Sequence, residues 1–88
     1  MNFRQIEDTL LTIIASVDGN KIPADRMQST RELTVAGEPG IALEILCSNL
    51  DDFGVAITAD TLSLIREIGQ AMGIDPDYWE RLTVKEHP

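Results

Sequence analysis

The stretch of residues 37–54, GEPGIALEILCSNLDDFG, decides the fold of this chain. Gly37 interrupts the preceding segment, and Pro39 suits the first turn of a helix because its missing N–H would have no partner there. Gly54 ends the stretch with the residue type that most readily adopts the left-handed conformation after a helix. These markers predict one helix, the most apolar of the chain.

The predicted helix is apolar on more than one side. At 100° per residue, Ile41 and Ile45 lie well round from a broader apolar face that has Cys47 on its edge. A helix with this pattern is typical of the middle of a small bundle, so we expect neighbours on two flanks. The broader face consists of Ala42, Leu43, Leu46, Leu50 and Phe53.

The polar strip of the same helix is acidic. Glu44 lies close to Ser48 and Asp51, and Asp52 lies beyond Ile45. Charge of one sign steers a basic partner, and apolar residues beside it would add contacts that lose water on binding. An exposed pair of isoleucines would equally fit a homo-oligomer contact. The predicted partner-binding residues are Glu44, Ser48, Asp51, Asp52, Ile41 and Ile45.

Two helices are predicted before this stretch. The first spans residues 3–17, and the second spans residues 23–36 with Pro23 at its first position. The second has the weakest apolar pattern, because most of residues 25–32 are polar. We expect a mostly solvated helix there, and a segment that orders on a partner is the alternative. The apolar stripe of the first helix consists of Phe3, Ile6, Leu10, Ile13, Ile14 and Val17.

Two more helices are predicted after it. One begins near Thr58 or Asp60, whose side-chain oxygens suit an N-cap, and ends at Gly73. A short last helix spans residues 76–82 with Asp75 as its cap, while residues 55–57 are too short to predict a sheet. The apolar face of the longer helix consists of Leu64, Ile65, Ile68, Ala71 and Met72. The predicted fold is all-α, a single domain over residues 1–88 with four helices plus a short fifth.

The charge balance limits the classes of partner. The 88 residues include 15 acidic and 7 basic side chains, which gives a formal net charge of −8. This excess repels nucleic acid and anionic membrane surfaces and favours a basic protein. The chain has neither a basic region followed by an apolar run at its start nor an apolar run long enough to span a membrane, so we expect a cytoplasmic protein.

The residues that carry chemistry are few. One cysteine and one histidine supply neither a disulfide nor a zinc set, and Cys47 is expected to be buried. His87 is next to the last residue and a poor candidate for a general base. No phosphate-binding glycine loop, calcium loop or Asp-Ser dipeptide for a phosphopantetheine arm occurs. We therefore predict no enzyme, no cofactor and no metal. Trp79 is expected in the core, and the role of Tyr78 is left open.

Residues 37–44, GEPGIALE, followed by Leu46 and Leu50, resemble the G-E-x-G-x-A-x-E signature of MafI-type immunity proteins. These small bacterial proteins neutralise the toxins of polymorphic and contact-dependent systems. The run of residues 57–73 is similar to the next helix of the family, and the resemblance covers roughly residues 32–74. It implies binding of a cognate toxin, with a basic nuclease as the expected class. Glu38 and Glu44 belong to the signature, which favours a structural role for them, such as capping free N–H groups at the helix start, over a toxin-facing one, since immunity proteins diversify where they touch their toxins.

An acidic regulatory adaptor or anti-activator is the alternative function. It would dock on a cytoplasmic protein through the same surface, so the residues alone favour neither. The neighbouring gene separates the two: a large toxin-like gene favours immunity, and an operon of regulators favours the adaptor. A small enzyme would require a cleft with convergent polar groups.

Overall fold

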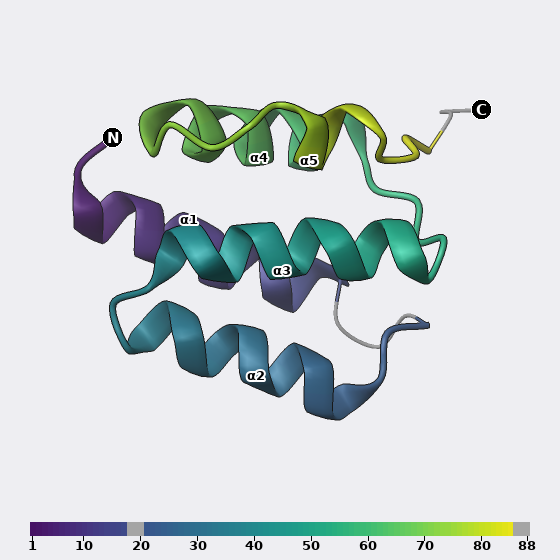
Figure 1. Cartoon of the computed structure of the whole chain (residues 1–88), viewed down its shortest axis with the longest axis horizontal. Helices are drawn as coiled ribbons and strands as arrows, with labels where there is room; N and C mark the ends of the chain where they lie inside the picture. Colours follow the sequence, from purple (N-terminus) through teal and green to yellow (C-terminus); the bar gives the residue numbers. More distant parts are fainter. Residues whose placement is uncertain (18–20, 86–88) are drawn as a thin grey trace.

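The structure is a computed structural model that describes residues 1–17 and 21–85. These residues form five α-helices and no strand (Figure 1). The helices are α1 (Phe3–Val17), α2 (Ala24–Val35), α3 (Pro39–Asp52), α4 (Ala59–Ala71) and α5 (Asp77–Glu80). The predicted all-α fold with four longer helices and a short fifth is confirmed. The turn predicted over residues 18–20 and the terminal His87 lie outside the described residues.

Helix α3 is the centre of the bundle. It packs against each of the other four helices, with α2 along one side and α5 and α4 along the other (Figure 1). The markers predicted from the sequence stand at its ends, because Pro39 is its first residue and Gly54 follows it with a φ of 61°. The backbone N–H of Val55 then donates to the carbonyl oxygen of Leu50 at 2.9 Å and closes the helix end.

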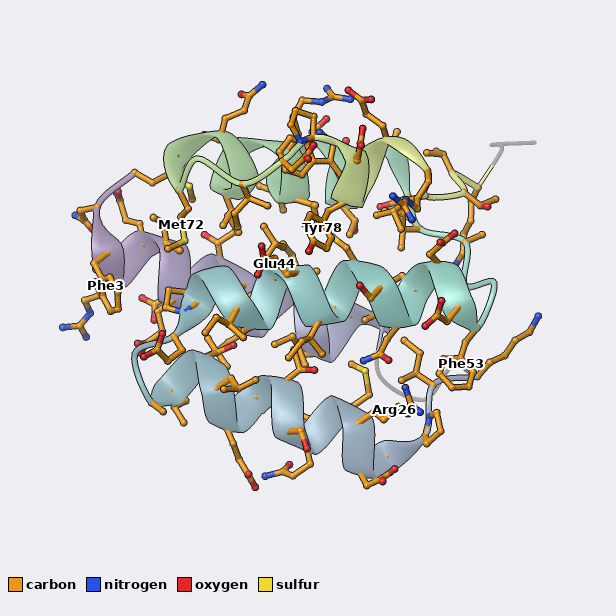
Figure 2. The ribbon with its side chains drawn as sticks, viewed as in Figure 1. Phe3, Arg26, Glu44, Phe53, Met72 and Tyr78 are labelled. Atoms are coloured by element: carbon orange, nitrogen blue, oxygen red, sulfur yellow. The ribbon has the colours of Figure 1, made fainter. Side chains whose placement is uncertain are left out.

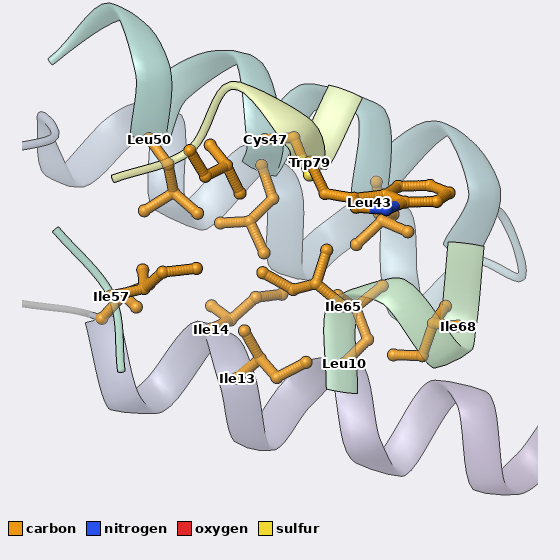
Figure 3. Close-up of a cluster of buried hydrophobic side chains, with 14 of the residues drawn as sticks. Leu10, Ile13, Ile14, Leu43, Cys47, Leu50, Ile57, Ile65, Ile68 and Trp79 are labelled. Atoms are coloured by element: carbon orange, nitrogen blue, oxygen red, sulfur yellow. The ribbon is translucent and has the colours of Figure 1, made fainter. Parts of the chain in front are cut away.

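The core lies between the five helices, and Figure 3 shows the part where α1, α3, α4 and α5 meet. Leu10, Ile14, Leu43 and Ile65 are fully buried there, in agreement with the predicted apolar faces. Cys47 is also buried, as expected from its place on the edge of the α3 face. Burying this continuous apolar surface is what holds a small helical domain of this kind together.

Two residues of the predicted apolar faces are exposed. Phe3 is 54% exposed, because it is the first residue of α1. Helical side chains tilt toward the N-terminus, so the side chain of Phe3 extends past the end of the bundle. Ala71, at the end of α4, is exposed as well. Leu62 of α4 packs against the core instead, although the sequence did not place it on the apolar face.

Helix α2 is buried more deeply than its polar sequence predicts. Thr30 and Thr34 are fully buried, and each hydroxyl donates to the carbonyl oxygen four residues earlier at 2.9 Å. Because the hydroxyls are satisfied within the helix, the rest of each threonine side chain packs as a small apolar group. The expectation of a mostly solvated helix is confirmed, since most of α2 is exposed, and the burial of the two threonines is the part that the polar pattern did not predict. The helix also begins at Ala24, since Pro23 has extended backbone with ψ of 142°.

Helix α5 fixes the end of the described chain to the bundle. It is shorter than the predicted range of 76–82, and its N-cap is Pro76 and not the predicted Asp75. The side chain of Asp75 instead accepts a hydrogen bond from the backbone N–H of Asp77 at 3.0 Å in the turn before the helix. After α5 the chain extends and pairs with the link between α3 and α4. The N–H of Ile57 donates to the carbonyl oxygen of Thr83, and the N–H of Lys85 donates to that of Ile57, which forms a single parallel bridge.

Trp79 is buried against α4, as predicted for the core. Its ring lies on Gly69, which has no side chain to occupy the same space. A Cβ atom at Gly69 would lie less than 3.0 Å from three carbon atoms of the ring. The pairing of these two residues is what allows α5 to lie directly on α4.

Candidate interaction surface

One side of α3 is not covered by the other helices. Ile41 is 47% exposed and Ile45 is 36% exposed, and they lie one helical turn apart. Ser48 and Asp52 are also exposed. At 100° per residue these four side chains project within about 60° of one another. They form what we call the open face of α3, and the exposure of both isoleucines agrees with the sequence analysis.

The other two predicted site residues lie at the border of the open face, on the side of α5. Glu44 is half-buried there, and Figure 2 shows it between α3 and α5. The carboxylate of Asp51 lies 3.9 Å from the guanidinium of Arg81, which follows α5. The structure therefore brings Ile41, Ile45, Ser48 and Asp52 together on one face, and it places Glu44 and Asp51 beside that face.

The carboxylates differ in their partners. Within residues 1–17 and 21–85, Asp51 has Arg81 opposite it, while Glu44 and Asp52 form no ion pair. The Asp51–Arg81 pair is separated by a long distance and its side chains are well exposed, so it contributes little to stability. The charges of Glu44 and Asp52 are therefore balanced by no cation of the described chain, and they contribute to the negative field around the open face.

The aromatic residue Tyr78 borders the same surface. It is half-buried in α5, and Figure 2 shows it on the side of α5 that faces Glu44. Its hydroxyl has no hydrogen-bond partner among the described residues. Its role could not be assigned from the sequence, because the direction of a side chain in a four-residue helix depends on how that helix packs. The burial of Trp79 next to it is what turns Tyr78 toward α3.

A cluster at the other end of α3 joins it to α2. The Nη1 atom of Arg26 donates to Oδ1 of the buried Asn49 at 3.2 Å. The guanidinium also lies over the ring of Phe53, 5.3 Å from its centroid, in a cation–π contact (Figure 2). This cluster was not predicted from the sequence, and the signal that could have indicated it is a lone asparagine among the apolar residues of α3.

The chemistry of the remaining groups is limited. Burial raises the pKa of the Cys47 thiol to about 12, so it is protonated and unreactive at neutral pH. In the part of the chain that the structure describes, no pocket is found and no three His, Cys, Asp or Glu side chains gather as a possible metal site. None of the helices described is both long enough and apolar enough to cross a membrane.

Comparisons with known proteins give no relative for this chain: no protein family, curated protein or solved structure matches it.

Proposed function

We propose that this protein is an immunity protein that binds a cognate bacterial toxin and neutralises it by protein–protein contact. The observation that carries the proposal is the open face of α3, where Ile41 and Ile45 are exposed on the central helix of an acidic chain. The expected partner is a basic nuclease, as the resemblance to MafI-type immunity proteins implies. A mechanism of this kind needs no chemistry from the chain itself.

The apolar and the acidic residues of the surface have different roles in binding. Ile41 and Ile45 provide the apolar centre whose removal from water favours the complex. Glu44 and Asp52 lie around that centre without ion-pair partners among the described residues. Both carboxylates would pair with basic side chains of the toxin that otherwise bind nucleic acid. The toxin could then no longer bind its nucleic-acid substrate.

Co-expression with the product of the neighbouring toxin-like gene tests the proposal. We expect growth to be restored and the two proteins to co-purify. Ile45→Asp should abolish both effects, because it places a charge at the apolar centre of the surface. The matched control is Val35→Asp, since Val35 is 63% exposed and lies at the end of α2, outside the open face.

Continued toxicity in the presence of the wild-type chain would overturn the proposal. Co-purification with a regulatory protein in place of a toxin would also overturn it and favour the adaptor. A complex that Val35→Asp and Ile45→Asp weaken equally would show that the open face of α3 is not the binding surface.

A further inference from the structure

Glu44 and Tyr78 lie at the border of the open face, on two helices that pack against each other. Helices α3 and α5 pack against each other, and Figure 2 shows the two side chains on the facing sides of these helices. Both residues are half-buried. A carboxylate and an aromatic ring therefore both face the junction between α3 and α5, in a partly desolvated place at the border of the open face.

Neither polar group of the pair is used within the described chain. The carboxylate of Glu44 forms no ion pair or hydrogen bond there, and the hydroxyl of Tyr78 forms no hydrogen bond. The basic residue that follows α5, Arg81, is directed elsewhere. It lies opposite Asp51 at 3.9 Å, and its Nε atom donates to the carbonyl oxygen of Asp77 at 3.0 Å.

The same protein shows how such a pair is used at another site. Arg26 lies over the ring of Phe53 while its Nη1 atom donates to the oxygen of Asn49. An aromatic ring and an oxygen acceptor together hold one guanidinium there. Glu44 and Tyr78 present the same two components, with a charged acceptor in place of an amide.

We propose that Glu44 and Tyr78 bind an arginine side chain of the partner, with the guanidinium on the tyrosine ring and its N–H groups directed to the carboxylate. This inference rests on the proposed function, because it specifies the partner chemistry at the same surface. Arginine fits better than lysine, since its planar guanidinium stacks on aromatic rings and can donate two parallel hydrogen bonds to a carboxylate. The isoleucines of the open face then cover apolar residues that flank this arginine.

Two synthetic peptides test the inference without a toxin. Both are amphipathic helices of equal charge with leucines along one face, and the other face carries arginine in one peptide and lysine in the other. Binding is followed by NMR, where Tyr78 gives an unambiguous ring signal because it is the single tyrosine of the chain. We expect the arginine peptide to shift this signal and to bind about tenfold more tightly than the lysine peptide.

Variants of the protein then locate the preference. Glu44→Gln and Tyr78→Ser should each remove the preference for arginine, while Tyr78→Phe, which keeps the ring, should retain it. Glu67→Gln on the exposed side of α4 is the matched control and should behave as the wild type.

Equal affinities for the two peptides would overturn the inference, and so would binding without a shift of the Tyr78 ring signal or no binding at all. The growth-rescue experiment is a separate measurement. A chain that restores growth but shows no arginine preference would overturn this inference alone, whereas continued toxicity would overturn the proposed function and remove the basis of this inference.

Discussion

Gly69 shows how one residue sets the position of a helix. Its lack of a side chain allows the ring of Trp79 to lie on α4, and a Cβ atom there would meet the ring itself. In an ordinary helical position alanine is more favourable than glycine by about 1 kcal/mol. Here the ring is fixed by its own burial, so we expect the steric cost to exceed this gain.

Gly69→Ala should therefore destabilise the protein by about 1–3 kcal/mol, the usual range for overpacking a core. The measurement is urea unfolding of both proteins, followed by the fluorescence of Trp79, the single tryptophan. Gln70→Gly, an exposed change in the same helix, provides the comparison for helix propensity alone. An alanine variant as stable as the wild type would show that the ring can move away.

Cys47 gives a pH dependence whose sign follows from its burial. Its pKa is raised from 9.0 to about 12, so the unfolded chain loses the thiol proton before the folded one does. The free energy of unfolding should be unaffected by this group up to about pH 8. Its contribution should fall as the pH rises through 9.0 toward 12. At pH 10 the loss is about 1.4 kcal/mol.

Cys47→Ala isolates this effect from the other groups that titrate in alkali. The difference in unfolding free energy between wild type and variant should be constant up to about pH 8 and should shrink by about 1.4 kcal/mol at pH 10. A difference that stays constant over the whole range would contradict the inferred burial. The wild-type thiol should also react with a thiol reagent only on unfolding.

At the scale of the helix, α2 and α3 show where sequence patterns succeed and fail. The bounds of α3 were predictable because Pro39 and Gly54 act locally on the backbone. The burial of Thr30 and Thr34 was not, since it depends on hydroxyls that turn back to their own helix and on the approach of a neighbour. The bridge between Ile57 and Val84 was not predictable either, because it joins segments far apart in the sequence and depends on how they pack.

The candidate site was predictable to a similar extent. Helical geometry alone places Ile41 and Ile45 away from the main apolar face, and both are exposed in the structure. Their role in binding remains a prediction. The orientation of Tyr78 and the pairing of Asp51 with Arg81 could not be predicted, because both depend on how α5 packs on α3 and α4.

The contact between α2 and α3 can be tested through Asn49. Asn49→Leu removes the acceptor for Arg26, and because that arginine is exposed and can return to water we expect a loss of about 1–2 kcal/mol in unfolding free energy. The adjacent Ser48 is exposed, so Ser48→Ala should change stability by less than about 0.5 kcal/mol. Equal stability of the two variants in urea unfolding would show that the Arg26 hydrogen bond contributes nothing.

At the scale of the whole molecule, the net charge of −8 governs how a partner is reached. Attraction between oppositely charged proteins raises the association rate and is screened by salt over about 10 Å at 0.1 M ionic strength. The dissociation rate depends instead on contacts made in the complex, such as those of Ile41 and Ile45. The two groups of residues in the proposed surface should therefore be separable by kinetics.

With the proposed toxin as partner, raising the salt concentration from 0.05 to 0.5 M should lower the association rate constant by about tenfold or more. Ile45→Ala should mainly raise the dissociation rate constant, and Asp52→Asn should mainly lower the association rate constant. Surface plasmon resonance separates the two constants. An association rate that does not depend on salt would contradict electrostatic steering by this chain.

The central place of α3 has a consequence for the entropy of binding. A helix in contact with all four others exchanges its amide hydrogens only when most of the structure opens, so α3 should have the slowest exchange of the bundle. The open face thus lies on the helix that has the least conformational entropy to lose on binding. A partner that docks there meets a preorganised surface and incurs little ordering cost on this side of the complex. When the partner binds, amide exchange in α3 should slow only by the amount that the increase in the global free energy of unfolding accounts for.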